Sequence, residues 1–302
     1  MNDQASTLRL VTSNDQADRA TSPQTSNQMK TRSYTQSIAI SGGKGGIGKS
    51  NLSVNLAIEL GALGKEVALL DADLGLANAD LLCGVTPKHH LGHVVAGWKE
   101  LDEISIYLSS NVRLLPGGSG VSKLANLSVD NGSDLLEKLK DLEESIDYLL
   151  IDTAAGVADN VMGMLSAAGD VIIIATPEPT SIVDAYATIK VILQKAESKP
   201  IHIVVNNVVG VGDAEQVFEQ IDQVVRKFLN HRVKFLGMIP TDPNLPEAVR
   251  EQTPIVRYAP QSPASRAIRL IAKQLHSQES TELLTPSEKA KSFWNRLNQN
   301  HN

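Results

Sequence analysis

The segment GGKGGIGKSN, residues 42–51, places two lysines five positions apart among glycines. From Gly43 to Ser50 it fits G-x-x-x-x-G-K-S, a pattern in which the backbone N–H groups of a loop surround phosphate groups. Lys49 is expected to neutralise the β- and γ-phosphates of a nucleotide, and the hydroxyl of Ser50 to ligate Mg²⁺. We assign the contacts with the nucleotide to Gly43, Gly45, Gly46, Ile47, Gly48, Lys49, Ser50 and Asn51.

Three aspartates end apolar segments that are typical of buried strands. Asp71 and Asp73 end EVALLDAD, and Asp152 ends DYLLIDT. Because parallel strands open on the same edge of a sheet, we expect these carboxylates beside the phosphate loop. Asp71 and Asp152 are candidates, together with Ser50, for holding Mg²⁺, and Asp73 would orient the attacking water. Taken singly, an aspartate after a strand is often only a turn residue or a helix cap.

Segments of strand length alternate with helical patterns in the middle of the chain. Residues 34–41 predict a strand, and residues 50–64 predict an amphipathic helix that ends at Gly61 or Gly64. Further strands are predicted at residues 66–73, 111–116, 147–153, 170–177, 200–207 and 233–240. Apolar strands that alternate with helices indicate a mostly parallel sheet covered on both faces. We therefore expect a doubly wound α/β domain over residues 34–276.

The two ends of the chain have a different composition. Residues 1–33 are rich in Asn, Gln, Ser, Thr and Asp without apolar periodicity, which predicts a disordered arm. Residues 277–302 are predicted to form a linker and a C-terminal amphipathic helix. Its start is marked by Thr285 as N-cap, Pro286 at the first helical position and Glu288 in a capping box.

Composition limits the classes of protein that the chain can belong to. Of its 302 residues 42% are apolar, and no apolar run approaches the ~20 residues that a membrane span needs. The first residues lack the pattern of a secretory signal, so we expect a cytoplasmic protein. The net charge of −6 becomes −7 for the central domain, because the arm contributes +1 and the tail contributes none. Nucleic acid is therefore not expected as a partner.

Lys44 is not needed for a phosphate loop, and from the residues alone it could be a solvated surface lysine. The residues K-G-G-x-G-K-S, and the central domain as a whole, resemble the deviant Walker A ATPases, the ParA/MinD branch of the P-loop NTPases. The resemblance implies an ATP-bound homodimer in which Lys44 completes the partner subunit's site, as an arginine finger does. Lys44, Lys49 and Asp73 are then the candidate catalytic residues.

The resemblance also bears on which base is bound. The N-K-x-D motif that recognises guanine is absent from the sequence, which favours ATP. Asn206 and Pro240 match positions that flank the adenine in the family. Asn207 stands where several relatives have arginine, so its role is open.

Within the superfamily the residues favour one branch. Iron–sulfur carriers need paired cysteines, whereas the sequence has one cysteine, and the acidic domain disfavours DNA partitioning. LLDADLGLANADLLCGV and TPEPTSIVDAYATIKV are similar to the MinD-like FlhG (FleN) group, over about residues 36–275. This implies a switch ATPase that regulates flagellar number or placement. A DNA-partitioning ATPase and a nucleotide-bound scaffold with negligible turnover are the alternatives.

The arm carries a short motif of the same group. Asp3, Gln4, Ala5, Leu8 and Arg9 match D-Q-A-x-x-L-R, with which FlhG proteins stimulate the GTPase of FlhF. The resemblance implies an FlhF-type GTPase as a partner, and a flagellar transcription regulator or flagellar switch components as further ones. The alternative is an inert disordered arm.

The tail helix resembles the membrane-targeting helix of MinD-like proteins. Phe293, Trp294 and Leu297 fall on one face of the predicted helix and would enter inner-membrane lipid. We expect reversible attachment of a cytoplasmic protein to the cytoplasmic face of the inner membrane. The alternative is a helix that packs back on the domain.

Overall fold

The computed structural model describes residues 35–73, 78–118, 120, 129–279 and 292–299. The chain divides into two units, Met1–Arg32 and Ser33–Asn302, and every described residue belongs to the second. The motif in the arm and the predicted start of the tail helix, Thr285 to Glu288, lie outside the described residues.

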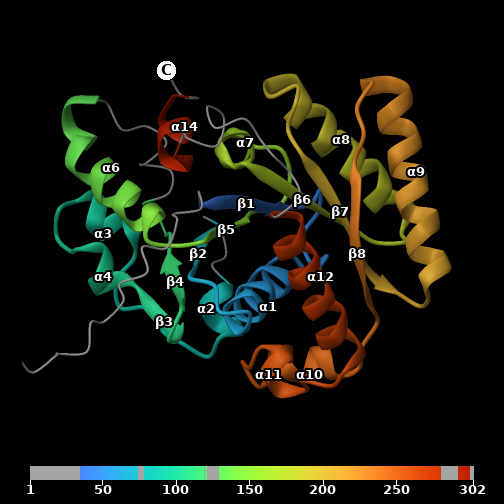
Figure 1. The fold of residues 1–302 in the computed structure, drawn as a ribbon, viewed down its shortest axis with the longest axis horizontal. Helices are drawn as coiled ribbons and strands as arrows, with labels where there is room; N and C mark the ends of the chain where they lie inside the picture. The colour runs from blue at the N-terminus through green and yellow to red at the C-terminus, as the bar shows by residue number, and fades with distance from the viewer. Residues whose placement is uncertain (1–34, 74–77, 119, 121–128, 280–291, 300–302) are drawn as a thin grey trace, which may run out of the picture. The chain divides into compact units, whose positions relative to one another are not determined.

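The described residues form one eight-stranded sheet with the order β3-β4-β2-β5-β1-β6-β7-β8 (Figure 1). Every neighbouring pair is parallel except β3 and β4, which are antiparallel. The strands are β1 Gln36–Ser41, β2 Val67–Ala72, β3 Ile106–Ser109, β4 Val112–Pro116, β5 Tyr148–Thr153, β6 Asp170–Ala175, β7 Ile201–Val208 and β8 Lys234–Pro240. The predicted doubly wound, mostly parallel sheet is thereby confirmed.

Helices cover both faces of the sheet (Figure 1). On one face lie α1 Lys49–Ala62, α2 Ala79–Leu82, α10 Asn244–Arg250, α11 Ile255–Tyr258 and α12 Pro263–Glu279. On the other lie α3 Leu91–Val95, α4 Leu101–Ile104, α6 Val129–Glu144, α7 Asp159–Ala167, α8 Pro179–Lys195, α9 Val211–Leu229 and α14 Phe293–Gln299.

The strands are apolar along their whole length because both of their faces are buried. In β1, Ile38 and Ile40 pack in the layer of α1 and α12, while Ala39 between them packs in the layer of α7 and α8. Successive side chains of a strand point to opposite faces, so each face needs its own apolar set. This explains the continuous apolar runs of the sequence.

One strand was not predicted. β3 has four residues, pairs only with β4, and is irregular between Tyr107 and Ser109. Tyr107 is 61% exposed, so the segment lacks the apolar run that marks the buried strands. A short, half-exposed edge strand carries little signal in the sequence.

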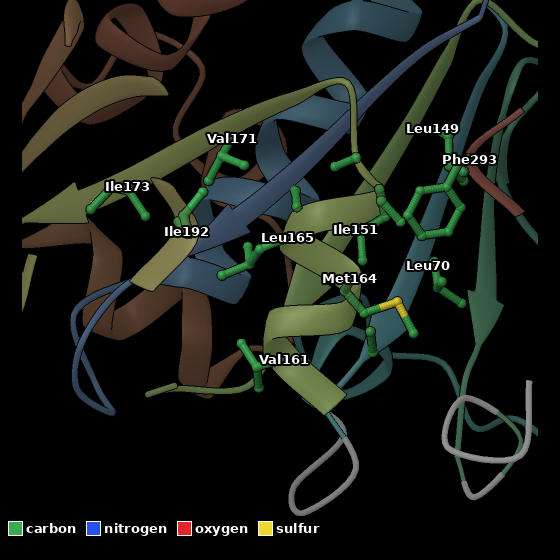
Figure 2. Packing of buried hydrophobic residues seen from close by; sticks show 14 of the residues in the cluster. Leu70, Leu149, Ile151, Val161, Met164, Leu165, Val171, Ile173, Ile192 and Phe293 are labelled. Atoms are coloured by element: carbon green, nitrogen blue, oxygen red, sulfur yellow. The ribbon is translucent and has the colours of Figure 1, made fainter. Parts of the chain in front are cut away.

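Helix α14 packs against the domain. It contacts α7 and α6, and Phe293 lies on the same side of the sheet as Leu149, Ile151 and Met164 (Figure 2). Phe293, Trp294 and Leu297 are 0%, 1% and 2% exposed. In this structure the apolar face is packed against the protein, which was the alternative to lipid, and attachment of the helix to lipid stays a prediction. The face is buried because apolar side chains of α6 and α7 pack against it.

Candidate nucleotide-binding site

The phosphate loop joins β1 to α1 and has an open side. Gly46 and Gly48 have φ of 77° and 97°, a left-handed conformation that suits glycine. A Cβ added to Gly45 or Gly46 would meet no atom within 4 Å, whereas one added to Gly43 would lie 2.2 Å from Cβ of Asp184. The loop therefore rests on α8 at one end and leaves space for a bound group at its middle.

Lys49, the first residue of α1, is buried at the base of this loop. Its Nζ donates a hydrogen bond to the carbonyl oxygen of Lys44 over 3.3 Å. Burial lowers the pKa of Lys49, and the carboxylates of Asp152 and Asp73 partly offset that effect. A buried ammonium group among backbone N–H groups is suited to binding a polyanion such as a triphosphate.

Asp71 and Asp152 occupy matching positions on the neighbouring strands β2 and β5. Both are buried, at 3% and 1% exposure. Burial raises the pKa of Asp71 to about 6 although the backbone N–H groups of Ala79 and Asp73 donate to it. Burial likewise raises the pKa of Asp152 to about 7, against hydrogen bonds from Ser50 and Ser53. Two buried carboxylates that resist ionisation are strongly favourable neighbours for a cation.

The residues around Asp152 fit Mg²⁺. Its Oδ1 accepts a hydrogen bond from Ser53 Oγ over 3.0 Å, whereas its buried Oδ2 has no hydrogen-bond partner among the described residues. Mg²⁺ prefers oxygen ligands and keeps several waters and phosphate oxygens, so it needs few protein ligands. Asp152, Asp71 and Ser50 bring such oxygens to one place, and their role as Mg²⁺ ligands stays a prediction. Ser53 was missed because it carries no motif, being one turn into α1.

Asn206 and Pro240 lie at the ends of β7 and β8. Nδ2 of Asn206 donates to the carbonyl oxygen of Ile47 over 2.8 Å, which ties the end of β7 to the phosphate loop. Asn207 is exposed, has a φ of 58°, and lies where the pairing of β7 with β8 is irregular. Thr241 Oγ1 donates a hydrogen bond to its Oδ1 over 2.9 Å. The side chain of Asn207 thus bonds to the residue that follows β8.

Lys44 lies on the same loop but is directed elsewhere. Its Nζ pairs with the carboxylate of Glu178 and lies 3.5 Å from Thr180 Oγ1, both at the start of α8. The sequence predicts a special role for Lys44 but not its pairing with Glu178, which lies 134 positions further along the chain. Four of the predicted residues lie together at the C-terminal ends of the strands: Lys49, Asp71, Asp73 and Asp152. Lys44 lies on the same loop, and its side chain is directed away from them toward α8.

The fold and this edge define a P-loop nucleotide-binding protein. The family model ParA, described as NUBPL iron-transfer P-loop NTPase, matches residues 33–276. The chain belongs to the MinD/ParA family of P-loop ATPases.

Relatives in this family include flagellar and cell-division proteins. The chain is 38% identical to the antiactivator FleN of Pseudomonas aeruginosa, over 83% of this chain and 89% of that protein. It is 35% identical to the flagellum site-determining protein YlxH of Helicobacter pylori, over 87% and 90%. The structure of MinD from Pyrococcus horikoshii complexed with Mg-ADP matches with a TM-score of 0.65 and 27% identity, over 82% of this chain and 100% of that one.

In the part of the chain that the structure describes, none of the helices combines the length and the apolar character needed to cross a membrane.

Proposed function

We propose that the protein is an ATPase switch that dimerises in the ATP state and regulates the number or placement of flagella. The observation that carries this proposal is the group of Lys49, Asp71 and Asp152 at one edge of the sheet. Similarity to FleN and YlxH over most of their lengths supports the flagellar role.

The residues at the C-terminal ends of the strands would have different roles in ATP hydrolysis. The loop and Lys49 hold the phosphates, while Asp71, Asp152 and Ser50 would hold Mg²⁺, which neutralises charge on the transferred phosphoryl group. The carboxylate of Asp73 is close enough to Lys49 to raise the pKa of its ammonium group, which supports the proposal that Asp73 orients the attacking water. Lys44 would reach the phosphates of a second copy, so that turnover requires the dimer.

Dependence on the dimer can be tested with the unmodified protein. We expect the rate of ATP hydrolysis per mole of protein to rise with protein concentration until the dimer is saturated. The concentration at half-maximum should match the dimer dissociation constant from sedimentation. A nucleotide-bound scaffold would instead show negligible turnover at every concentration. A DNA-partitioning ATPase would show salt-sensitive binding to nonspecific DNA.

Attachment to lipid is a further part of the proposal, and it requires α14 to leave its position. The docked helix is held by Glu143, which accepts from the Ser292 hydroxyl and from the Phe293 N–H over 2.5 and 2.8 Å. The indole N–H of Trp294 is buried without a partner among the described residues, which costs about 1–3 kcal/mol. Because this cost is removed when the indole N–H reaches water, it favours release of α14 from the domain. ATP-dependent sedimentation with anionic liposomes should be lost when the chain ends after Glu279.

The arm is proposed to stimulate an FlhF-type GTPase. A disordered segment can carry a short motif into another protein's active site and become ordered there. Leu8 would supply an apolar anchor, Arg9 a charge for phosphate or carboxylate, and Gln4 a contact with water. A peptide of residues 1–20 should accelerate GTP hydrolysis, Gln4→Ala should remove most of the effect, and Asp15→Ala should not. No stimulation by the peptide or by the whole protein would contradict the flagellar role.

A further inference from the structure

Glu178 is the residue before α8, and its carboxylate is not used to cap that helix. It occupies the N-cap position, followed by Pro179, but makes no side-chain hydrogen bond to the backbone of the first turn. The shorter carboxylate of an N-cap Asp ordinarily accepts from those N–H groups. Here it pairs with the ammonium group of Lys44 instead.

The loop and α8 are in close contact around this pair. The backbone of Gly43 lies flush against Asp184 of α8, so a side chain at Gly43 would clash. The carbonyl oxygen of Lys44 is held by Lys49, and the Lys44 side chain reaches Glu178 and Thr180. The direction of the Lys44 side chain is thus set within its own subunit, by the start of α8.

We propose that Glu178 is a positioning residue that holds Lys44 in the monomer and releases it when the dimer forms. This inference rests on the proposed function, in which Lys44 contacts the nucleotide of the partner. Dimerisation then exchanges two Lys44–Glu178 pairs for two contacts with phosphate. A triphosphate competes with the carboxylate better than a diphosphate does, because it carries more negative charge. Glu178 thereby makes dimerisation more selective for ATP.

The size of the effect follows from the exposure of the pair. The side chains of Lys44 and Glu178 are 33% and 62% exposed, so the pair is screened by solvent. An exposed pair changes an equilibrium by a factor of roughly 1.5 to 5, and two pairs are broken in each dimer. Removing the carboxylate should therefore tighten the dimer by the square of that factor, about two- to 25-fold.

The variant Glu178→Gln keeps the size of the side chain and removes its charge. Glu197→Gln is the matched control, because Glu197 is an exposed carboxylate just beyond the far end of α8. Dimer dissociation constants are measured by sedimentation equilibrium with Mg²⁺ and a non-hydrolysable ATP analogue, and again with ADP. We expect Glu178→Gln to tighten the ATP-state dimer and to produce dimer in ADP, with the difference from wild type shrinking at high salt.

A second measurement follows Lys44 in the nucleotide-free protein. The rate at which an N-hydroxysuccinimide ester acylates its amine, read by mass spectrometry, should rise in Glu178→Gln and stay unchanged in Glu197→Gln. Equal dimer constants for wild type and Glu178→Gln would overturn the inference while leaving the proposed function intact. If the wild type forms no dimer with ATP, the inference about Glu178 and the proposed function are both wrong. An unchanged acylation rate would show that Glu178 does not hold Lys44.

Discussion

The two ends of the sheet differ in how their side chains are held. At the C-terminal ends of the strands, here called the carboxyl edge, the backbone fixes the positions of the functional side chains. At the N-terminal ends, here called the amino edge, side-chain contacts hold a helix in place. Asp71 and Asp152 face each other because β2 and β5 pair in register, and Lys49 follows a glycine loop. At the other edge, Arg296 of α14 donates to the carbonyl oxygen of Ala167 and to Ser37 Oγ, over 2.5 and 3.0 Å.

The two edges differ in how easily their structure can rearrange. Moving an aspartate of the carboxyl edge would require breaking the sheet, so this edge is suited to binding a ligand in one fixed geometry. The contacts of α14 join residues 129 to 259 positions apart and involve one short helix. That helix can be lost without disturbing a strand. We infer that the carboxyl edge changes only through single side chains such as Lys44, whereas the amino edge can release a whole helix.

The largest effect is expected from Lys49→Ala. It removes the buried positive charge at the phosphate loop, so the dissociation constant for ATP should rise at least about 100-fold. Calorimetric titration measures it, with the exposed Lys88→Ala as the control. The thermal stability of the nucleotide-free protein should change little. An unchanged ATP affinity would mean that the carboxyl edge does not bind triphosphate as described.

Asp73→Ala should separate binding from cleavage. A residue that orients water contributes mainly in the transition state, so the rate of hydrolysis should fall about 100-fold or more while ATP affinity changes less than about threefold. Single-turnover hydrolysis and titration together measure this difference. A comparable loss in both quantities would instead give Asp73 a structural role at the end of β2.

The amino edge is tested by removing α14. Ending the chain after Glu279, or introducing Phe293→Glu with Trp294→Glu, should lower the free energy of unfolding by about 2–5 kcal/mol, the worth of three buried side chains less ordering costs. The truncation and the double substitution should lower the free energy of unfolding by the same amount, because each frees the same helix. The affinity for ATP should be unaffected. Urea denaturation measures the loss, with Asn295→Ala as control. A drop in ATP affinity would show that the edges are not independent.

Stability should depend on pH through the carboxyl edge. The pKa of Asp152 in the folded protein, about 7, lies above its ordinary value of 3.8. The folded state then binds more protons than the unfolded state between these values, so the free energy of unfolding falls as pH rises through this range. Without nucleotide and Mg²⁺ we expect Asp152 to contribute a decrease of about 2 kcal/mol from pH 5 to 7. Asp152→Asn should reduce the slope and leave the smaller contribution of Asp71, whose pKa is also raised, to about 6. An equal slope in both proteins would contradict the assignment.

The two edges also differ in how much of them the sequence predicts. The loop and the aspartates could be found because each belongs to a contiguous motif or ends an apolar strand. The roles of Ser53 and Glu178 could not be predicted, because their partners Asp152 and Lys44 are distant in the chain. Glu178 lies within TPEPTSIVDAYATIKV, but that similarity does not indicate a contact with Lys44. The apolar face of α14 was visible, but a pattern of Phe293, Trp294 and Leu297 cannot distinguish lipid from another part of the protein. β3 was missed because an exposed edge strand needs no apolar run.

The central claim is that ATP joins two copies and that Lys44 then acts across the interface. It is tested most directly by comparing wild type and Lys44→Ala by sedimentation with ATP and Mg²⁺, alongside the rate of hydrolysis. The account predicts that Lys44→Ala binds ATP within about threefold of wild type as a monomer. It also predicts that the variant forms no ATP-dependent dimer and has no turnover above background. A Lys44→Ala protein that dimerises and hydrolyses ATP like wild type would contradict it.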